Sequence, residues 1–291
     1  MNGTEQVGVA LIRDVFFGDG ASERLVSRLG EAKARGAALA VLPEIPCNPW
    51  SPATKMARDE DAEERGGPRW RMQADAARSI GIALVGGAIV RDESGTRRNT
   101  AIVFDSRGEV VGTYCKLHLP EEPGFWETSH YEPGVEWPSV FEVAGLRVGV
   151  QICSDINRPE GCHLLGAQGA DVIVAPRSTE QVTFHRWRPV FIANSLTSGC
   201  YVMSVDRPMP EQGVEIGQPS FAVSPDAEVL IESSDAVTVA TVDRRLVTEC
   251  HRKYPGYLAT RSRLYAEAWG TMPDRGAWPH AGTRAGGVGA Q

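Results

Sequence analysis

The sequence lacks several features that would place it in a specialised class of protein. No apolar run among its 291 residues is long enough to span a membrane, and no signal-peptide pattern is present. The six cysteines are scattered without a C-x-x-C pair, and neither they nor the six histidines have the spacing of metal ligands. The net charge of −7 is spread along the chain, which argues against nucleic acid or an anionic membrane as a partner. We therefore expect reduced thiols and a cytoplasmic location.

What is present is the composition and pattern of an ordinary α/β protein, with 42% hydrophobic and 23% charged residues. Short apolar runs bounded by turn residues predict strands at 6–12, 37–42, 82–90, 100–105, 110–116, 146–152, 170–175, 200–206, 220–224, 228–232 and 237–242. Other patterns predict helices at 22–35, 69–79, 159–169 and 184–198. Residues 96–99 are expected to form a turn, and residues 45–67 a polar loop that is either a flap or a solvated face.

The alternation of strands and helices continues to about residue 245 without an internal boundary. We therefore expect one domain over residues 1–281, with a C-terminal extension from about residue 246. The Gly-rich residues 282–291 are expected to be a disordered tail.

Cys153 ends one of the predicted strands, in the stretch LRVGVQICSDINRPE. A thiol at the carboxyl end of a buried strand, just before a helix, lies where open α/β sheets place their reactive groups. The alternative is a buried core thiol, because free cysteine packs like a small hydrophobic residue. Taken alone, Cys153 favours the core-thiol alternative. The choice between the two roles therefore depends on which other reactive side chains the sequence places at the same sheet edge.

Two charged residues also stand at strand ends. Glu44 follows the apolar run 37–42 and a proline, and Lys116 ends the run VVGTYCK. We expect both near the sheet edge that carries Cys153, although Glu44 alone could be a solvated loop acid and Lys116 an exposed edge charge. The residues after strand 170–175, at 176–179, are a further candidate for a pocket wall.

Glu127 lies in a loop, residues 121–136, that is rich in proline, glycine and aromatic side chains. Phe125, Trp126 and Tyr131 flank it. Aromatic residues around a loop acid indicate a fixed and partly buried carboxylate, with a surface glutamate as the alternative.

Glu44, Lys116, Glu127 and Cys153, in this order, resemble the nitrilase or carbon-nitrogen hydrolase superfamily. The resemblance covers nearly the whole chain, through the segments GAALAVLPE, YCKLHLP, FWE, GVQICSD and GQPSFAVSPDAEVL. It implies a four-layer α-β-β-α sandwich, commonly paired with a second copy across the helices that follow Glu44 and Cys153. A homodimer or larger homo-oligomer is therefore expected.

The resemblance also implies a role for each residue: Cys153 matches the nucleophile, Glu44 the general base, Lys116 the lysine that stabilises the oxyanion, and Glu127 a supporting glutamate. Amide chemistry asks for the same groups. An amide carbon is a poor electrophile, so a thiol activated by a neighbouring base is needed, and cationic or N–H donors must stabilise the developing oxyanion. Lys116 and the Ser154 N–H can do so. No metal or organic cofactor is needed.

The residues after the cysteine indicate a branch of the superfamily. The motif C-x-D-x-x-x-P-E beginning at Cys153 resembles amidases and carbamoylases, whereas true nitrilases usually carry Trp-Glu after the cysteine. The loop PGFWETSHYEPG resembles that of N-carbamoylputrescine amidases. Enzymes for N-carbamoyl-D-amino acids carry paired arginines where this chain has Ile156 and Asn157. We expect hydrolysis of a small amide or N-carbamoyl compound through a thioester; nitrile hydrolysis and acyl transfer from Cys153 to an amine are the alternatives.

The candidates for substrate contact are Ser154, Trp126, Arg177 and Asn157. Arg177 stands where many relatives carry an apolar or aromatic residue, and it either meets a substrate carboxylate or pairs with a structural acid. The acids Glu121, Glu122 and Glu132 either favour a cationic amine on the substrate or form a solvated rim.

Overall fold

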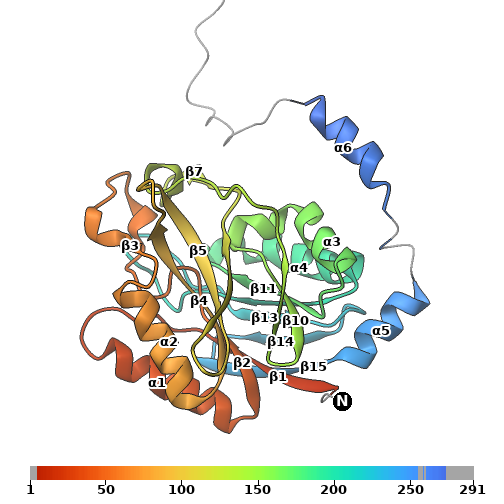
Figure 1. Ribbon diagram of the computed structural model, residues 1–291, viewed down its shortest axis with the longest axis horizontal. Coiled ribbons are helices and arrows are strands. Elements are labelled where there is room, and N and C mark those ends of the chain that lie inside the picture. Colours follow the sequence, from red (N-terminus) through yellow and green to blue (C-terminus); the bar gives the residue numbers. More distant parts are fainter. Residues whose placement is uncertain (1–4, 255–257, 259, 273–291) are drawn as a thin grey trace, which may run out of the picture.

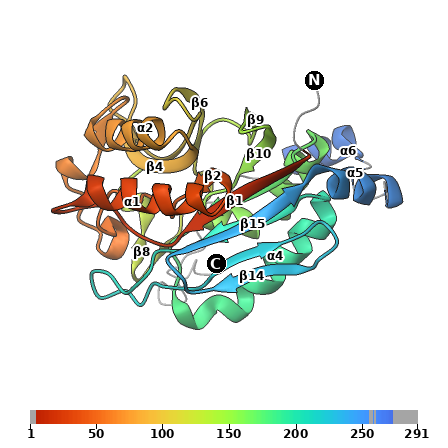
Figure 2. The same cartoon turned by 90° about the horizontal axis from the view of Figure 1, so that it is seen from below.

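The computed structural model describes residues 5–254, 258 and 260–272. Two β-sheets pack face to face, and a pair of helices covers the outer face of each sheet (Figures 1 and 2). The α/β class and the four-layer α-β-β-α sandwich expected from the sequence are confirmed. No helix in the described part of the chain is long and apolar enough to cross a membrane.

The first sheet has the strand order β15-β1-β2-β4-β5-β6, with β3 paired to β4. Its strands are β15 (Val237–Asp243), β1 (Gln6–Ile12), β2 (Ala37–Val41), β4 (Ala83–Arg91), β5 (Arg97–Phe104), β6 (Val110–Cys115) and β3 (Glu63–Glu64). Strands β1, β2 and β4 are parallel, while β5, β6 and β15 pair antiparallel with their neighbours. Helices α1 (Ala21–Ala34) and α2 (Pro68–Ile80) cover its outer face.

The second sheet has the strand order β14-β13-β12-β11-β10-β9. Its strands are β14 (Val229–Ser233), β13 (Ser220–Val223), β12 (Tyr201–Val205), β11 (Val172–Pro176), β10 (Leu146–Val150) and β9 (Val140–Val143). The central strands β10, β11 and β12 are parallel. Helices α3 (Pro159–Ala167) and α4 (Phe184–Ser198) pack on the outside of this sheet.

Alternation along each central strand explains the layers. In β1, Val9 and Leu11 belong to the core between the sheets, whereas Ala10 and Ile12 belong to the core under α1 and α2. In β10, Gly149 faces α3 so closely that a Cβ there would lie 2.8 Å from a methyl carbon of Leu165. Burial on both faces is why these strands read as nearly continuous apolar runs.

The structure corrects the turn predicted at residues 96–99. Strand β5 already begins at Arg97, and the turn lies earlier, where the Asp92 N–H donates to the Thr96 carbonyl at 3.0 Å. The Asp92 carboxylate also accepts the backbone N–H groups of Ser94 and Thr96. Capping by Asp92 therefore closes the hairpin four residues before the polar stretch that resembled a turn.

Two segments predicted as loops contain short elements. Residues 45–67 include the 3-10 helices Ser51–Ala53 and Asp59–Asp61, and the loop around Glu127 contains the hairpin of β7 (Glu121–Glu122) and β8 (Phe125–Trp126). Beyond β15, the helices α5 (Arg244–Lys253) and α6 (Ser262–Gly270) form the described part of the C-terminal extension. Figure 1 shows α6 standing away from the two sheets. The predicted tail at 282–291 lies outside the described residues.

Candidate active site

Three buried charged side chains meet at one edge of the first sheet. The Lys116 Nζ atom donates to Glu44 Oε1 at 2.7 Å and to the two oxygens of Glu127 at 2.6 and 2.7 Å. Glu44 follows β2, Lys116 follows β6, and Glu127 begins a 3-10 turn after β8. All three side chains are fully shielded from solvent. The alternatives of an exposed acid, an exposed lysine or a surface glutamate therefore do not apply.

The electrostatics of this group keep the lysine charged. Burial alone would lower the pKa of Lys116, but the neighbouring carboxylates of Glu127 and Glu44 outweigh it, and the pKa lies above its ordinary value. Burial raises the pKa of Glu127, against the opposing effect of Lys116. Two carboxyl groups thus share one buried ammonium group, and the raised pKa of Glu127 disfavours the state in which both are ionised.

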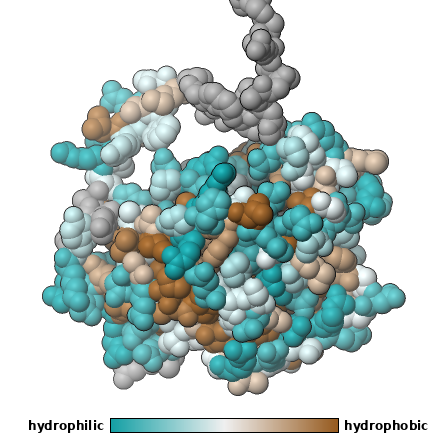
Figure 3. Space-filling model, turned by 180° about the vertical axis from the view of Figure 1, so that it is seen from behind, coloured by the Kyte–Doolittle hydropathy of each residue, from teal (hydrophilic) through white to brown (hydrophobic). Residues whose placement is uncertain are grey.

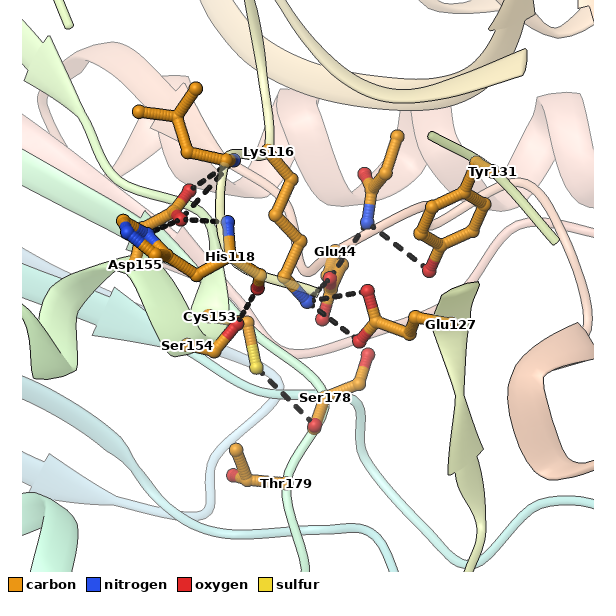
Figure 4. Close-up of polar contacts among 12 residues, drawn as sticks. Glu44, Lys116, His118, Glu127, Tyr131, Cys153, Ser154, Asp155, Ser178 and Thr179 are labelled. Atoms are coloured by element: carbon orange, nitrogen blue, oxygen red, sulfur yellow. Dashed lines mark hydrogen bonds and ion pairs between the residues drawn. The ribbon is translucent and has the colours of Figure 1, made fainter. Parts of the chain in front are cut away.

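Cys153 lies beside this group, in the turn that follows β10 (Figure 4). Its backbone φ is +48°, a left-handed conformation that non-glycine residues rarely adopt. Its Sγ atom lies 3.6 Å from the Ser178 carbonyl oxygen, to which the thiol donates. Burial, followed by the charge of Glu44, raises the pKa of the Cys153 thiol well above its usual value. The resting thiol is therefore protonated and needs a base to become a nucleophile.

A fully buried arginine from the other sheet holds the Glu44 segment. Arg207, which follows β12, donates to the carbonyl oxygens of Glu44, Ile45 and Asn48 at 3.0, 3.1 and 2.7 Å. It also forms a bidentate ion pair with Glu211, both contacts being 2.7 Å. Ile45, directly after Glu44, has a φ of +38°, which is strained for a β-branched residue. The arginine thus stabilises an unfavourable backbone turn that aims the Glu44 side chain.

A buried aspartate ties Lys116 to the turn that carries Cys153. Asp155 accepts the Tyr114 hydroxyl at 2.9 Å, and the backbone N–H and ring Nδ1 of His118 lie 2.9 and 2.8 Å from it. Tyr114 and His118 are two residues before and after Lys116. The Ser154 hydroxyl also donates to the His118 carbonyl. The C-x-D part of the sequence motif therefore fixes the lysine strand against the cysteine turn.

A cavity of about 420 Å³ opens in front of Cys153. Ser154 and Asn157 line it, as do Ser178 and Thr179 from the segment predicted as a pocket wall. Its charged walls combine the acids Glu121, Glu122 and Glu180 with the bases Arg158 and Arg186. Because both signs of charge are present, the cavity does not favour a cationic amine over an anionic tail on the substrate.

Two candidate contact residues lie away from this cavity. The Arg177 guanidinium is fully buried and donates to Asp206 at 2.7 Å, to Ser204 and to Gln218. This is the pairing with a structural acid that the sequence left open. The ring of Trp126 lies under the Lys55 ammonium, 4.1 Å from its centroid. Neither residue lines the cavity at Cys153.

Residues 19–252 match the model of the Carbon-nitrogen hydrolase family. This chain belongs to the carbon-nitrogen hydrolase family. The resemblance to the nitrilase superfamily is thereby confirmed, while the branch within it is not fixed by the match.

Relatives of this carbon-nitrogen hydrolase carry different activity names. A protein of Pyrococcus abyssi named "Nitrilase" is 33% identical over 230 residues, covering 78% of this chain and 83% of its own. "Omega-amidase NIT2" of Xenopus tropicalis is 30% identical over 252 residues, covering 84% and 90%. Among solved structures, a carbon-nitrogen hydrolase from Helicobacter pylori G27 superposes with a TM-score of 0.80 at 18% identity, covering 91% of this chain and 98% of its own. At that identity the likeness shows the shared fold.

This carbon-nitrogen hydrolase also contains site residues that the sequence did not reveal. Asn99, in the segment mistaken for a turn, donates to Glu44 Oε1 at 2.8 Å and is buried. The sequence around Arg207 carries no signal of its role except the position of this residue after a buried strand. Ser178 belonged to the predicted pocket wall without a specific role.

Proposed function

We propose that this carbon-nitrogen hydrolase cleaves a small amide or N-carbamoyl compound through a thioester on Cys153. The observation that carries the proposal is the buried Glu44–Lys116–Glu127 ion group beside the Cys153 thiol, which lines a cavity. Because burial raises the pKa of the Cys153 thiol and disfavours the thiolate, its reactivity depends on a neighbouring base. Glu44 Oε2 has no hydrogen-bond partner within the described structure and is free to accept a proton.

In the acylation step, the Cys153 sulfur attacks the carbonyl carbon while Glu44 takes the thiol proton. The carbonyl oxygen gains negative charge and is stabilised by the Lys116 ammonium and the Ser154 N–H. Collapse of the tetrahedral intermediate breaks the C–N bond, and Glu44 returns the proton to the leaving nitrogen. Ammonia or an amine departs and the acyl group remains on Cys153 as a thioester.

In the second step, water attacks the thioester carbon and gives a proton to Glu44. The new tetrahedral intermediate breaks its C–S bond, and the sulfur recovers a proton as the acid leaves. Glu127 keeps Lys116 in place through both steps, since it holds the ammonium with two short contacts. Ser154 and Asn157 are the proposed substrate contacts, because both line the cavity.

The relatives support an amide substrate and keep a nitrile as the second candidate. Omega-amidases are among the similar proteins, and one solved structure shows a mutant of an amidase from Nesterenkonia sp. AN1 with the acetamide moiety of fluoroacetamide attached to its active-site cysteine. The Pyrococcus abyssi relative named as a nitrilase favours nitrile hydrolysis.

A panel of primary amides, N-carbamoyl amines, N-carbamoyl amino acids and nitriles of matched side chains tests the proposal through ammonia release and identification of the acid. We expect the highest kcat/KM for an amide or N-carbamoyl compound, and no turnover by Cys153→Ser. Preference for a nitrile would replace the proposed substrate and leave the Cys153 chemistry standing. A new amide formed from an added amine would indicate acyl transfer instead of hydrolysis.

A single domain, a homo-oligomer and a cytoplasmic location stay predictions. Figure 3 supports the homo-oligomer with a hydrophobic area on the face opposite that of Figure 1, bordered by hydrophilic residues. Helix α6 also exposes Leu264, Tyr265 and Trp269. Sedimentation velocity tests the oligomer, and a monomer at micromolar concentration would contradict it.

A further inference from the structure

Two buried oxygen atoms in the active site have no hydrogen-bond partner within the described structure. They are Glu44 Oε2 and the hydroxyl oxygen of Ser178, and neither residue is more than 1% exposed. A buried polar atom without a partner destabilises the folded protein unless a ligand completes it. Both atoms belong to residues around Cys153, where a bound substrate can supply the missing partner.

Ser178 is placed to touch the reacting part of a substrate. It follows β11 and lines the same cavity as Cys153, and its backbone oxygen accepts the Cys153 thiol at 3.6 Å. Figure 4 shows Ser178 beside Cys153, with its hydroxyl turned toward the Glu127 carboxylate. A substrate bonded to the sulfur therefore lies within reach of the Ser178 side chain.

The polar atoms near Cys153 form two sets, hydrogen-bond donors and hydrogen-bond acceptors. Lys116 and the Ser154 N–H are donors suited to a carbonyl oxygen, whereas Glu44 Oε2, the Ser178 carbonyl and the Ser178 hydroxyl can all accept. The Ser178 hydroxyl can also donate, but Glu44 Oε2 and the Ser178 carbonyl can only accept, so N–H groups on the ligand suit this side of the site. A primary amide or a terminal carbamoyl group supplies two, while a nitrile or an ester supplies none at the scissile bond.

We infer that the Ser178 hydroxyl hydrogen-bonds the nitrogen of the scissile amide and thereby selects primary amides and terminal carbamoyl groups. The inference rests on the proposed function, because it assumes that this nitrogen leaves from a carbonyl carbon bonded to Cys153. It assigns Ser178 to substrate specificity and leaves the nucleophile and base unchanged.

The test compares two substrates in Ser178→Ala: the best primary amide of the panel and the p-nitrophenyl ester of the same acyl group. We expect kcat/KM for the amide to fall about 10- to 100-fold, because a site built to bind an N–H loses that bond, while the ester changes less than about threefold. Ser220→Ala is the matched control, since the Ser220 hydroxyl is equally buried and without a described partner but does not line the cavity. It should leave both rates unchanged.

Equal loss for amide and ester would overturn the inference and assign the Ser178 hydroxyl to the oxyanion or to structure. No loss for either substrate would also overturn it. If the alanine variant does not fold, Ser178→Gly repeats the comparison, because it also removes the hydroxyl and keeps the backbone carbonyl. Mass spectrometry of Cys153 with the ester distinguishes failure of the proposed function from failure of the role of Ser178. If the native protein shows no acyl adduct, the proposed function fails. If the adduct forms but Ser178→Ala leaves the amide-to-ester ratio of kcat/KM unchanged, only the role of Ser178 fails.

Discussion

Arg207 offers a way to move Glu44 without changing any of the reacting groups. Its guanidinium spans three backbone carbonyls of the Glu44 segment and the Glu211 carboxylate, at distances between 2.7 and 3.1 Å. Arg207→Lys keeps the positive charge but replaces a planar fork of five donors with a single ammonium. The strained turn at Ile45 then loses most of its support, and Glu44 is free to shift.

The structure sets the expected magnitudes. Removing one partner of a buried ion pair typically costs about 3–5 kcal/mol, so Arg207→Met should lower the melting temperature by roughly 6–20 °C. Arg207→Lys should be milder in stability. A misplacement of about 1 Å at a reacting group costs on the order of 10²-fold in rate, so we expect Arg207→Lys to lower kcat about 10- to 100-fold with little change in KM.

The assay is steady-state ammonia release below the melting transition of each variant. Leu29→Ala is the control for lost stability, because Leu29 is fully buried under the first sheet and its truncation costs about 2–5 kcal/mol without touching Glu44. It should keep the native kcat. A folded Arg207→Lys with native kcat, or a control that loses as much activity, would refute the positioning of Glu44 by Arg207.

Two further predictions concern the charged group and the thiol. Lys116→Met should lower kcat at least 100-fold in the same ammonia assay, because the interaction of the ammonium group with the carbonyl oxygen strengthens as the oxyanion forms. A change confined to KM would mean that Lys116 only binds the substrate. Because burial and Glu44 raise the pKa of the Cys153 thiol, modification of this residue by methyl methanethiosulfonate, followed by mass spectrometry, should be slow at pH 7 and still rising at pH 9. A rate that levels off below pH 8 would show a thiolate already formed at rest.

The fold and the four central residues were predictable because they lie in or next to regular patterns. Buried parallel strands appear in the sequence as unbroken apolar runs, and a charged residue or thiol at the end of such a run is easily recognised. The order of Glu44, Lys116, Glu127 and Cys153 then added the resemblance that made a loop glutamate recognisable.

The supporting residues were not predictable, because their partners are distant in sequence. Asn99 donates a hydrogen bond to Glu44, 55 positions away in the sequence. The polar residues beside it made the start of β5 resemble a turn. For Arg177 the sequence left a substrate carboxylate and a structural acid as equal alternatives, because its partner Asp206 lies 29 positions away. The vacant hydrogen-bonding capacity of Ser178 is a property of the folded cavity, for which the sequence carries no local signal.

Intact-protein mass spectrometry during turnover tests the central claim most directly. A rapid quench of the native protein with a good amide substrate should show one added acyl mass, and peptide mapping should place it on Cys153. The adduct should be absent in Cys153→Ala, which is nearly isosteric and should remain folded. An adduct on another cysteine such as Cys47 or Cys115, or full turnover by Cys153→Ala, would contradict the assignment of Cys153 as the nucleophile.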